Sequence, residues 1–205
     1  MSPRKSPSRP LGRRVEVRPE RRIVKVFTEG KGSEPDYLRG LAKLYLDTNS
    51  FNFVVSDKHG VPRTLVDLAK RCRKDEEIDD VWCVFDVECP QPHPLLREAC
   101  QSAADAGIGV AVSNPCFEYW LTIHFMDFAK PETTDDMESI SRRLDGRANK
   151  RITFEQHYAD HVEEACDRAR RQHRSHQSAG TLFPRDNPST SVYKLVDFLR
   201  SLSTL

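Results

Sequence analysis

The sequence predicts an α/β fold: a parallel sheet of about four strands, flanked by helices, with extra helices at the C-terminal end. Short β-branched runs alternate with stretches in which apolar residues recur at helical spacing. Each run ends abruptly in polar residues and is followed by a helical stretch, so the chain repeats a strand-helix unit. Repeated units of this kind favour right-handed crossovers and a sheet covered on both faces.

The predicted elements follow one another regularly from residue 23 onward. Strands are expected at residues 23–28, 51–55, 81–85 and 110–113. The first helix should begin at Ser33, because a cap residue, a proline and an acid precede an apolar stripe. Two more helices follow the second and third strands, and Gly107 should close the third helix. A short apolar helix is expected within residues 114–125.

The C-terminal part is expected to add helices to this core. Residues 130–152 combine an acidic, Thr-rich stretch with a basic patch, and they are interpreted as a loop or lid insertion. Apolar stripes then predict helices around residues 158–169 and 192–199, with residues 186–190 capping the last helix.

Length and composition place this fold in one domain, residues 23–205, behind a basic tail at residues 1–22. The tail is either a solvated segment or an arm that binds nucleic acid. The balance of 32 basic and 31 acidic side chains argues against a strongly cationic coat protein. No apolar run approaches the ~18 to 20 residues that span a bilayer, so a cytoplasmic protein is expected. The six cysteines fit reduced core residues.

The run VWCVFDVE at residues 81–88 is the centre of the candidate site. It is too short and apolar for a surface helix, and it ends in Asp86 and Glu88. In an extended chain residues i and i+2 point to the same side, so both carboxylates should aim at one point. Paired acids that end a buried strand are costly without a cation, and hard oxygen ligands suit Mg²⁺ or Mn²⁺.

Polar residues also follow the other predicted strands. Glu29 and Gly30 follow the first strand, and Ser113 and Asn114 end the fourth. Ligands of parallel α/β sheets bind beyond the carboxyl ends of the strands, so these residues should meet the acids of the third strand. The alternative for Glu29 is an exposed loop acid.

Four segments then resemble the RloB family and occur in that family's order. They are VFTEGKGSEPDYL at 26–38, VFDVE at 84–88, SNPCFEYWL at 113–121 and NPST at 187–190. The resemblance implies a toprim-like (Rossmannoid) fold, the metal-binding catalytic module of topoisomerases, primases and several nucleases. It also implies a role in prokaryotic phage defence, often beside an AAA- or ABC-type ATPase.

The toprim pattern has a glutamate after the first strand as general acid or base, which Glu29 matches, and a D-x-D metal pair, where Asp86 and Glu88 stand. Glu88 departs from the pattern, since aspartate is usual there. Glu118 is the candidate for a third metal-binding acid. Candidate phosphate-binding residues are Lys31, Asn114, Lys150, Arg151 and Lys194.

Other residues are interpreted structurally. Glu34 and Asp36 are expected to be helix N-terminal charges, and Ser33 a cap. His124 shares a stripe with Trp120 and Leu121, so it is at least as well explained as a core residue as by catalysis.

Two functions are therefore expected to compete. The first is a Mg²⁺- or Mn²⁺-dependent nuclease that acts as a defence effector on DNA or RNA. The second is a catalytically degenerate toprim module that binds nucleic acid or a partner protein, and the glutamate at position 88 favours it.

The first testable prediction concerns the tail. Deleting residues 1 to about 22 should leave the melting temperature of the domain unchanged, because the tail has too little apolar surface to offset its ordering entropy. Thermal unfolding of the full and shortened chains measures this, and a large drop in the shortened chain would contradict the domain boundary.

Overall fold

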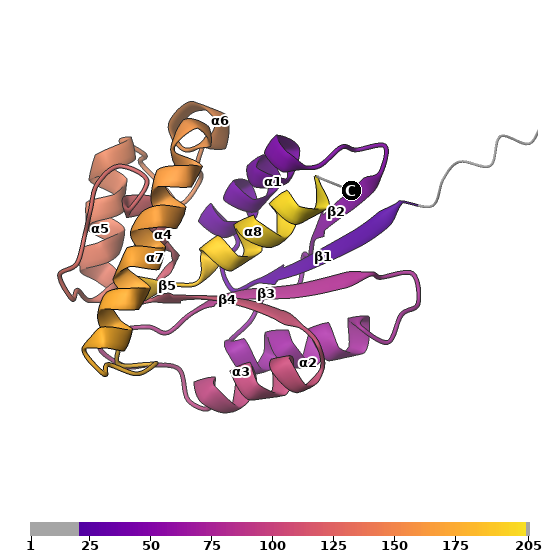
Figure 1. The fold of residues 1–205 in the computed structure, drawn as a ribbon, viewed down its shortest axis with the longest axis horizontal. Coiled ribbons are helices and arrows are strands. Elements are labelled where there is room, and N and C mark those ends of the chain that lie inside the picture. Colours follow the sequence, from indigo (N-terminus) through magenta and orange to yellow (C-terminus); the bar gives the residue numbers. More distant parts are fainter. Residues whose placement is uncertain (1–20, 204–205) are drawn as a thin grey trace, which may run out of the picture.

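The computed structural model describes residues 21–203, which form a sheet between two layers of helices (Figure 1). Within these residues five strands pair in the order β2-β1-β3-β4-β5. The first four strands run parallel and the last pairs antiparallel with β4. The strands are β1 (Arg22–Thr28), β2 (Phe51–Val55), β3 (Asp80–Asp86), β4 (Gly109–Asn114) and β5 (Ser189–Thr190). The predicted parallel α/β core is confirmed.

Helices cover both faces of the sheet, as Figure 1 shows. One face carries α1 (Ser33–Tyr45) and α8 (Val192–Leu202). The other carries α2 (Pro62–Cys72) and α3 (Leu96–Asp105). The remaining helices gather at the end to which the parallel strands point: α4 (Phe117–Thr122), α5 (Thr134–Asp145), α6 (Phe154–His157), the 3-10 turn η1 (Ala159–His161) and α7 (Val162–Ser178).

The alternation of side chains along β3 divides the core into two parts. Val81, Cys83 and Phe85 pack with α2 and α3, whereas Val84 points to the α1 and α8 face. This period of two continues to Asp86, which therefore leaves the strand on the same face as Val84. The sheet geometry thus aims Asp86 at α1 and α4.

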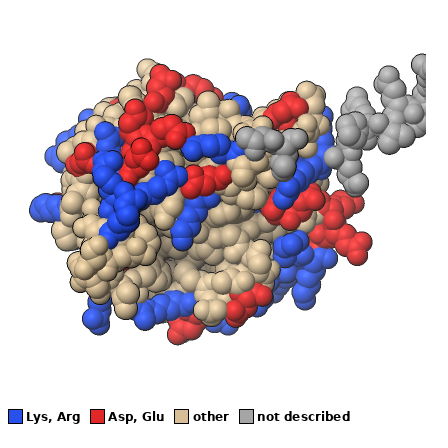
Figure 2. Space-filling view, in the orientation of Figure 1, with Lys and Arg blue, Asp and Glu red and all other residues tan. Residues whose placement is uncertain are grey.

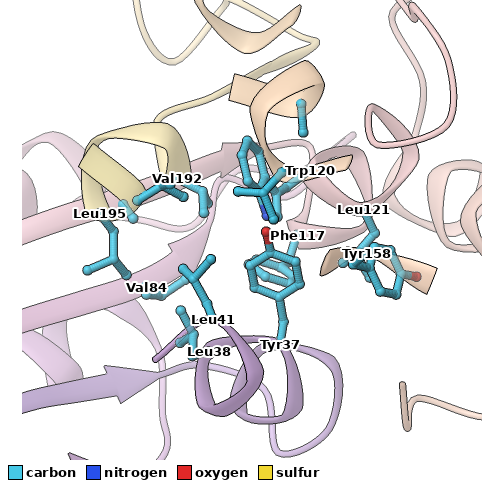
Figure 3. Close-up of a cluster of buried hydrophobic side chains, with 14 of the residues drawn as sticks. Tyr37, Leu38, Leu41, Val84, Phe117, Trp120, Leu121, Tyr158, Val192 and Leu195 are labelled. Atoms are coloured by element: carbon cyan, nitrogen blue, oxygen red, sulfur yellow. The ribbon is translucent and has the colours of Figure 1, made fainter. Parts of the chain in front are cut away.

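Tyr37 lies at the centre of the larger core, between α1 and α4 (Figure 3). Its ring makes edge-to-face contacts with Phe117, Trp120 and Tyr158, at centroid distances of 5.6, 6.0 and 5.9 Å. Such pairs add about 0.5–1.5 kcal/mol beyond area burial. This cluster fixes the starts of α1 and α4, which border the candidate site.

Three sequence predictions need correction. Arg22 belongs to β1 rather than to the tail, and its Nε lies 2.8 Å from Asp80 Oδ2. The segment 130–152 is not a loop, because it contains α5, whose Met137 is buried. Residues Ser189–Thr190 form a strand rather than only a cap.

Three further expectations concern the tail, the cysteines and membrane-spanning helices. Residues 1–20 of the predicted tail lie outside the described residues. All six cysteines fall within residues 21–203, and all six are free thiols, as expected. No helix among residues 21–203 combines the length and apolar character needed to cross a membrane.

The packing of α6 against α1 generates a stability prediction. A Cβ at Gly40 of α1 would lie 2.3 Å from Phe154 Cγ, so Gly40→Ala should destabilise the fold by about 1–3 kcal/mol through overpacking. Alanine is otherwise favoured over glycine in helices by about 1 kcal/mol. Urea unfolding measures the change. In a Phe154→Ala background the same substitution should cost much less, and equal cost in both backgrounds would contradict this contact.

Candidate metal centre at the carboxyl edge of the sheet

Neighbouring strands bring the predicted acids together. Glu29 directly follows β1 and Asp86 ends β3, and these two strands are hydrogen-bonded neighbours. The Asp86 amide donates a hydrogen bond of 3.2 Å to Glu29 Oε2. Glu29 and Glu88 carboxylate oxygens lie within 4.8 Å of each other. The structure therefore brings Glu29 and Glu88 together, with the Asp86 backbone beside Glu29, although Asp86 is not in the group of ligand atoms that lie within 4.8 Å of one another.

Asp86 occupies the deepest position in this cluster. It is 9% exposed, and its Oδ1 has no hydrogen-bond partner among the described residues. Burial raises the pKa of Asp86 well above its usual range, and the nearby charges of Glu34, Glu118, Glu29 and Glu88 raise it further. The inner end of the cluster is therefore closed to solvent at Asp86.

Glu88 lies just beyond the end of β3 and is held by two other segments of the chain. The alternation of β3 continues through buried Val87, and the chain turns at Glu88, which has a φ of 72°. Its amide donates to Pro115 O at 2.9 Å, and Thr134 Oγ1 at the start of α5 donates to its Oε2 at 2.6 Å. The charge of Glu88 acts on Asp86, so both acids reach one cluster, and contacts from Pro115 and Thr134 hold the Glu88 backbone and carboxylate there.

His93 is a member of the site that the sequence reasoning missed. The His93 amide donates to Val87 O at 2.9 Å, which folds the loop after β3 back onto the strand end. The ring places Nε2 2.7 Å from Glu29 Oε1. One ligand atom each from Glu29, Glu88 and His93 lie within 4.8 Å of one another. Its position in the loop that follows the acids, five residues after Glu88, was the available signal.

The charge state of Glu29 reflects opposing effects. Burial raises the pKa of Glu29, and the charge of Glu88 raises it further. The Asp86 amide and the charge of His93 lower it. On balance the pKa is raised, which suits a group that exchanges protons.

Glu34 also belongs to the cluster, although the sequence suggests only a helix N-terminal charge. It lies in the first turn of α1, where its Oε1 accepts the Gly30 amide at 2.8 Å. It is buried, and burial together with the charges of Glu118 and Glu29 raises its pKa to about 7. Glu34 is therefore both a helix N-terminal charge and a member of the acidic cluster, because the first turn of α1 borders the cluster.

Glu118, the third predicted acid, lies in the first turn of α4 and is buried. Its Oε1 accepts a hydrogen bond of 3.0 Å from Ser33 Oγ, and Arg147 Nη2 lies 3.5 Å from the same oxygen. Arg147 is only 7% exposed and also pairs with Asp145. A buried arginine therefore balances part of the negative charge on the α4 side.

The predicted phosphate-binding residues separate into two groups. Lys150 and Arg151 border the site, since Ser33 Oγ also donates to Lys150 O at 3.2 Å and Arg151 Nε lies 2.7 Å from Asp36 Oδ2. Lys150 pairs with Glu138 at 2.7 Å, and this hydrogen bond raises the pKa of the lysine. Lys31 is exposed beside Gly30.

Asn114 and Lys194 have other surroundings. The Asn114 side chain is buried, and its Nδ2 donates to Pro184 O at 3.0 Å and to Asp186 Oδ1 at 3.1 Å. Its amide protons hold the C-terminal loop and are not free for a phosphate, which corrects the prediction. Lys194 borders a separate pocket of about 260 Å³ lined by β4 residues such as Val110 and by Phe183.

His124 is a buried core residue, which the sequence favours at least as strongly as a catalytic role. It is 2% exposed, its Nε2 lies 3.0 Å from Tyr37 Oη, and its Nδ1 lies 2.9 Å from Trp120 O. Burial lowers the pKa of His124 to about 3.

The residues present fit a divalent cation. Five carboxylates converge, and a buried Asp86 oxygen among them lacks a hydrogen-bond partner within residues 21–203. Oxygen-rich clusters of this kind are the usual binding sites of Mg²⁺ and Mn²⁺. The mostly parallel sheet with helices on both faces defines a Rossmann-like α/β protein, which is consistent with the toprim-type fold that the sequence predicts.

The sequence matches the family model described as RloB-like protein over residues 24–199. The chain therefore belongs to the RloB-like family. No curated protein and no solved structure matches it significantly.

The raised pKa of Glu34 predicts how stability depends on pH. A glutamate has an ordinary pKa of 4.5, against about 7 for Glu34 in the folded protein. Between these values the folded state binds more protons than the unfolded state, so stability falls as pH rises. For the metal-free protein the fall should approach about 3 kcal/mol.

Urea unfolding in the presence of a chelator, between pH 4.5 and 7, tests this prediction. Glu34→Gln should flatten the dependence, whereas Glu76→Gln, at an exposed position, should leave it unchanged. Stability that rises across this range would show that Glu34 is not held in its neutral form.

Proposed function

We propose that this chain is a toprim-type nuclease that hydrolyses phosphodiester bonds with Mg²⁺ or Mn²⁺ and acts as an effector of prokaryotic anti-phage defence. The observation that carries the proposal is the buried Asp86 carboxylate, with an unpartnered oxygen, in a cluster with four other acids. Such crowding is unfavourable without a cation, because each charge opposes ionisation of its neighbours. Membership of the RloB-like family supports the proposal.

Asp86 and Glu88 would hold the ion, with Glu118 as a further candidate ligand. When bound, a divalent ion of this kind stabilises negative charge on the phosphoryl oxygens and lowers the pKa of a coordinated water. Thr134 contributes by holding Glu88 Oε2 at 2.6 Å, which restricts the rotation of that side chain. Orientation of ligands by such neighbours commonly affects metal affinity 10–100-fold.

Glu29 is the residue proposed to move a proton to the leaving oxygen or from the attacking one. Its position directly after β1 places it beside Asp86, and burial raises its pKa, which suits a group that transfers a proton. The Asp86 amide donates a hydrogen bond of 3.2 Å to Glu29 Oε2, which orients this carboxylate within the cluster.

Lys150, Arg151 and Lys31 are proposed to contact the phosphates of a nucleic-acid substrate, DNA or RNA. Lys150 and Arg151 are mostly exposed, with side-chain exposures of 64% and 71%, and they flank the acids across Ser33 and Asp36. Figure 2 shows basic and acidic side chains interspersed on one face of the molecule rather than a broad basic surface. We therefore infer local phosphate contacts rather than nonspecific binding along a charged face.

The alternative is a catalytically degenerate module that binds nucleic acid or a partner protein. An AAA- or ABC-type ATPase is the partner class that the family resemblance suggests. This alternative predicts that the protein binds nucleic acid or its partner equally well without a divalent ion. Calorimetric titration with Mg²⁺ or Mn²⁺, before and after Asp86→Asn, distinguishes the two.

Substitution of the acids tests the nuclease directly. Asp86→Asn and Glu29→Gln should each lower cleavage of mixed DNA and RNA substrates by roughly 10²–10⁴-fold in Mg²⁺ or Mn²⁺. Thermal stability of the metal-free variants should be unchanged or higher, because each substitution removes one like charge from the cluster. Gel assays and thermal unfolding provide the two measurements.

Asp67→Asn is a matched control, since Asp67 is exposed on α2 and lies 3.7 Å from Arg63. It should retain full cleavage. Cleavage that persists in both Asp86→Asn and Glu29→Gln would show that the chemistry lies elsewhere in the chain.

A further inference from the structure

The contact between His93 and Glu29 is unusual for a simple hydrogen bond. Nε2 of His93 lies 2.7 Å from Glu29 Oε1, with side-chain exposures of 17% and 19%. The two atoms are close, but their angle does not suit a hydrogen bond. His93 Nε2 is buried and has no hydrogen-bond partner among the described residues. The nitrogen therefore points into the acidic cluster without a directional partner.

The loop that carries His93 is held by several interactions near the strand end. Its amide bonds Val87 O at 2.9 Å. The Cys89 amide donates to Thr134 Oγ1 at 3.1 Å, and the Thr134 amide donates to Cys89 O at 3.0 Å. Thr134 thus anchors both this loop and the Glu88 carboxylate. The position of the imidazole relative to Glu88 is therefore built by the fold.

We propose that His93 is a metal ligand, and that Glu29, Glu88 and His93 together bind one divalent transition-metal ion. Their ligand atoms lie within 4.8 Å of one another, which leaves room for one ion between them. Among residues 21–203 they are the group of three or more potential ligands that meets this distance. The proposal rests on the proposed function and specifies which metal the site takes.

The donor set determines the class of metal. Mg²⁺ prefers oxygen ligands alone, whereas an imidazole nitrogen with two carboxylates suits transition metals such as Mn²⁺, Fe²⁺, Co²⁺ or Zn²⁺. Asp86 provides an independent indication of a ligand, because its Oδ1 is unpartnered among the described residues although Asp86 is 9% exposed. The charges of Glu29 and Glu88 act on Asp86, so this acid lies close to the three proposed ligands.

Coordination by Glu29 is compatible with its role in proton transfer. An ionised carboxylate has about four lone-pair sites on two oxygens. Oε1 faces His93, whereas Oε2 accepts the Asp86 amide. One oxygen can therefore ligate while the other retains its hydrogen bond or exchanges a proton.

Pulsed electron paramagnetic resonance of bound Mn²⁺ tests the proposal without an activity assay. The full chain loaded with Mn²⁺ should show ¹⁴N modulation from a directly bound imidazole, and ¹⁵N-histidine labelling should change its frequency. The modulation should disappear in His93→Gln and persist in His59→Gln. His59 is the matched control, because its Nδ1 lies 3.1 Å from Thr28 O, next to Glu29 in sequence but outside the ligand group.

Calorimetry provides a second measurement. His93→Gln should weaken Mn²⁺ binding at least tenfold, the lower limit for loss of a neighbour that merely orients a ligand. Mg²⁺ binding should change much less. The labelled wild-type spectrum keeps the test valid even if His93→Gln fails to fold.

The outcomes separate this proposal from the proposed function. Mn²⁺ binding without nitrogen modulation in the wild type would overturn the role of His93 and leave a carboxylate site for the nuclease. Modulation that survives in His93→Gln would also overturn it. Failure of the wild type to bind either Mn²⁺ or Mg²⁺ would overturn both the ligand proposal and the metal-dependent nuclease.

Discussion

The repulsion between carboxylates at the carboxyl edge of the sheet is the constraint around which this structure is arranged. Burial at the end of β3 raises the pKa of Asp86 well above its usual range, and the charges of four other acids raise it further. The parallel topology makes this crowding unavoidable, because β1 and β3 end at the same edge. The alternation of β3 then directs Asp86 toward the first turns of α1 and α4, where Glu34 and Glu118 lie. A sequence with apolar residues in place of Asp86, Glu34 and Glu118 would avoid this repulsion between carboxylates.

Each of the four acids around Asp86 accepts a hydrogen bond from an uncharged donor, and these bonds offset part of the repulsion between the carboxylates. The pairs are Gly30 N with Glu34, Asp86 N with Glu29, Ser33 Oγ with Glu118 and Thr134 Oγ1 with Glu88. Hydrogen bonds to an ionised carboxylate typically contribute about 1.5–3 kcal/mol. Arg147 adds a buried positive charge beside Glu118. The Asp86 Oδ1 atom receives no such partner within residues 21–203, so the compensation stops at the position where a cation would bind.

The strands and the convergence of Glu29 and Glu88 were predictable from sequence, because hydrophobic periodicity and parallel topology are properties of the chain itself. The position of Glu34 in the cluster was not, since its local context also explains it as a helix N-terminal charge. His93 was missed because a loop of irregular backbone brings it back to Val87, and no periodic pattern reports such a return. The strand at Ser189–Thr190 was missed because two residues carry too little pattern to predict a strand.

The glutamate at position 88 is the sequence feature that favours a degenerate module, and its geometry gives it another explanation. With a φ of 72°, the backbone at Glu88 departs from the extended path of β3. Positive φ in a residue with a side chain costs on the order of 1–2 kcal/mol, so neighbouring contacts must hold it, here from Pro115 and Thr134. From this turned backbone the carboxylate still comes within 4.8 Å of the Glu29 and His93 ligand atoms. An aspartate, one methylene shorter, would have less reach from the same backbone. The glutamate therefore fits the turn that carries it, and its presence alone does not argue that the site has lost its chemistry.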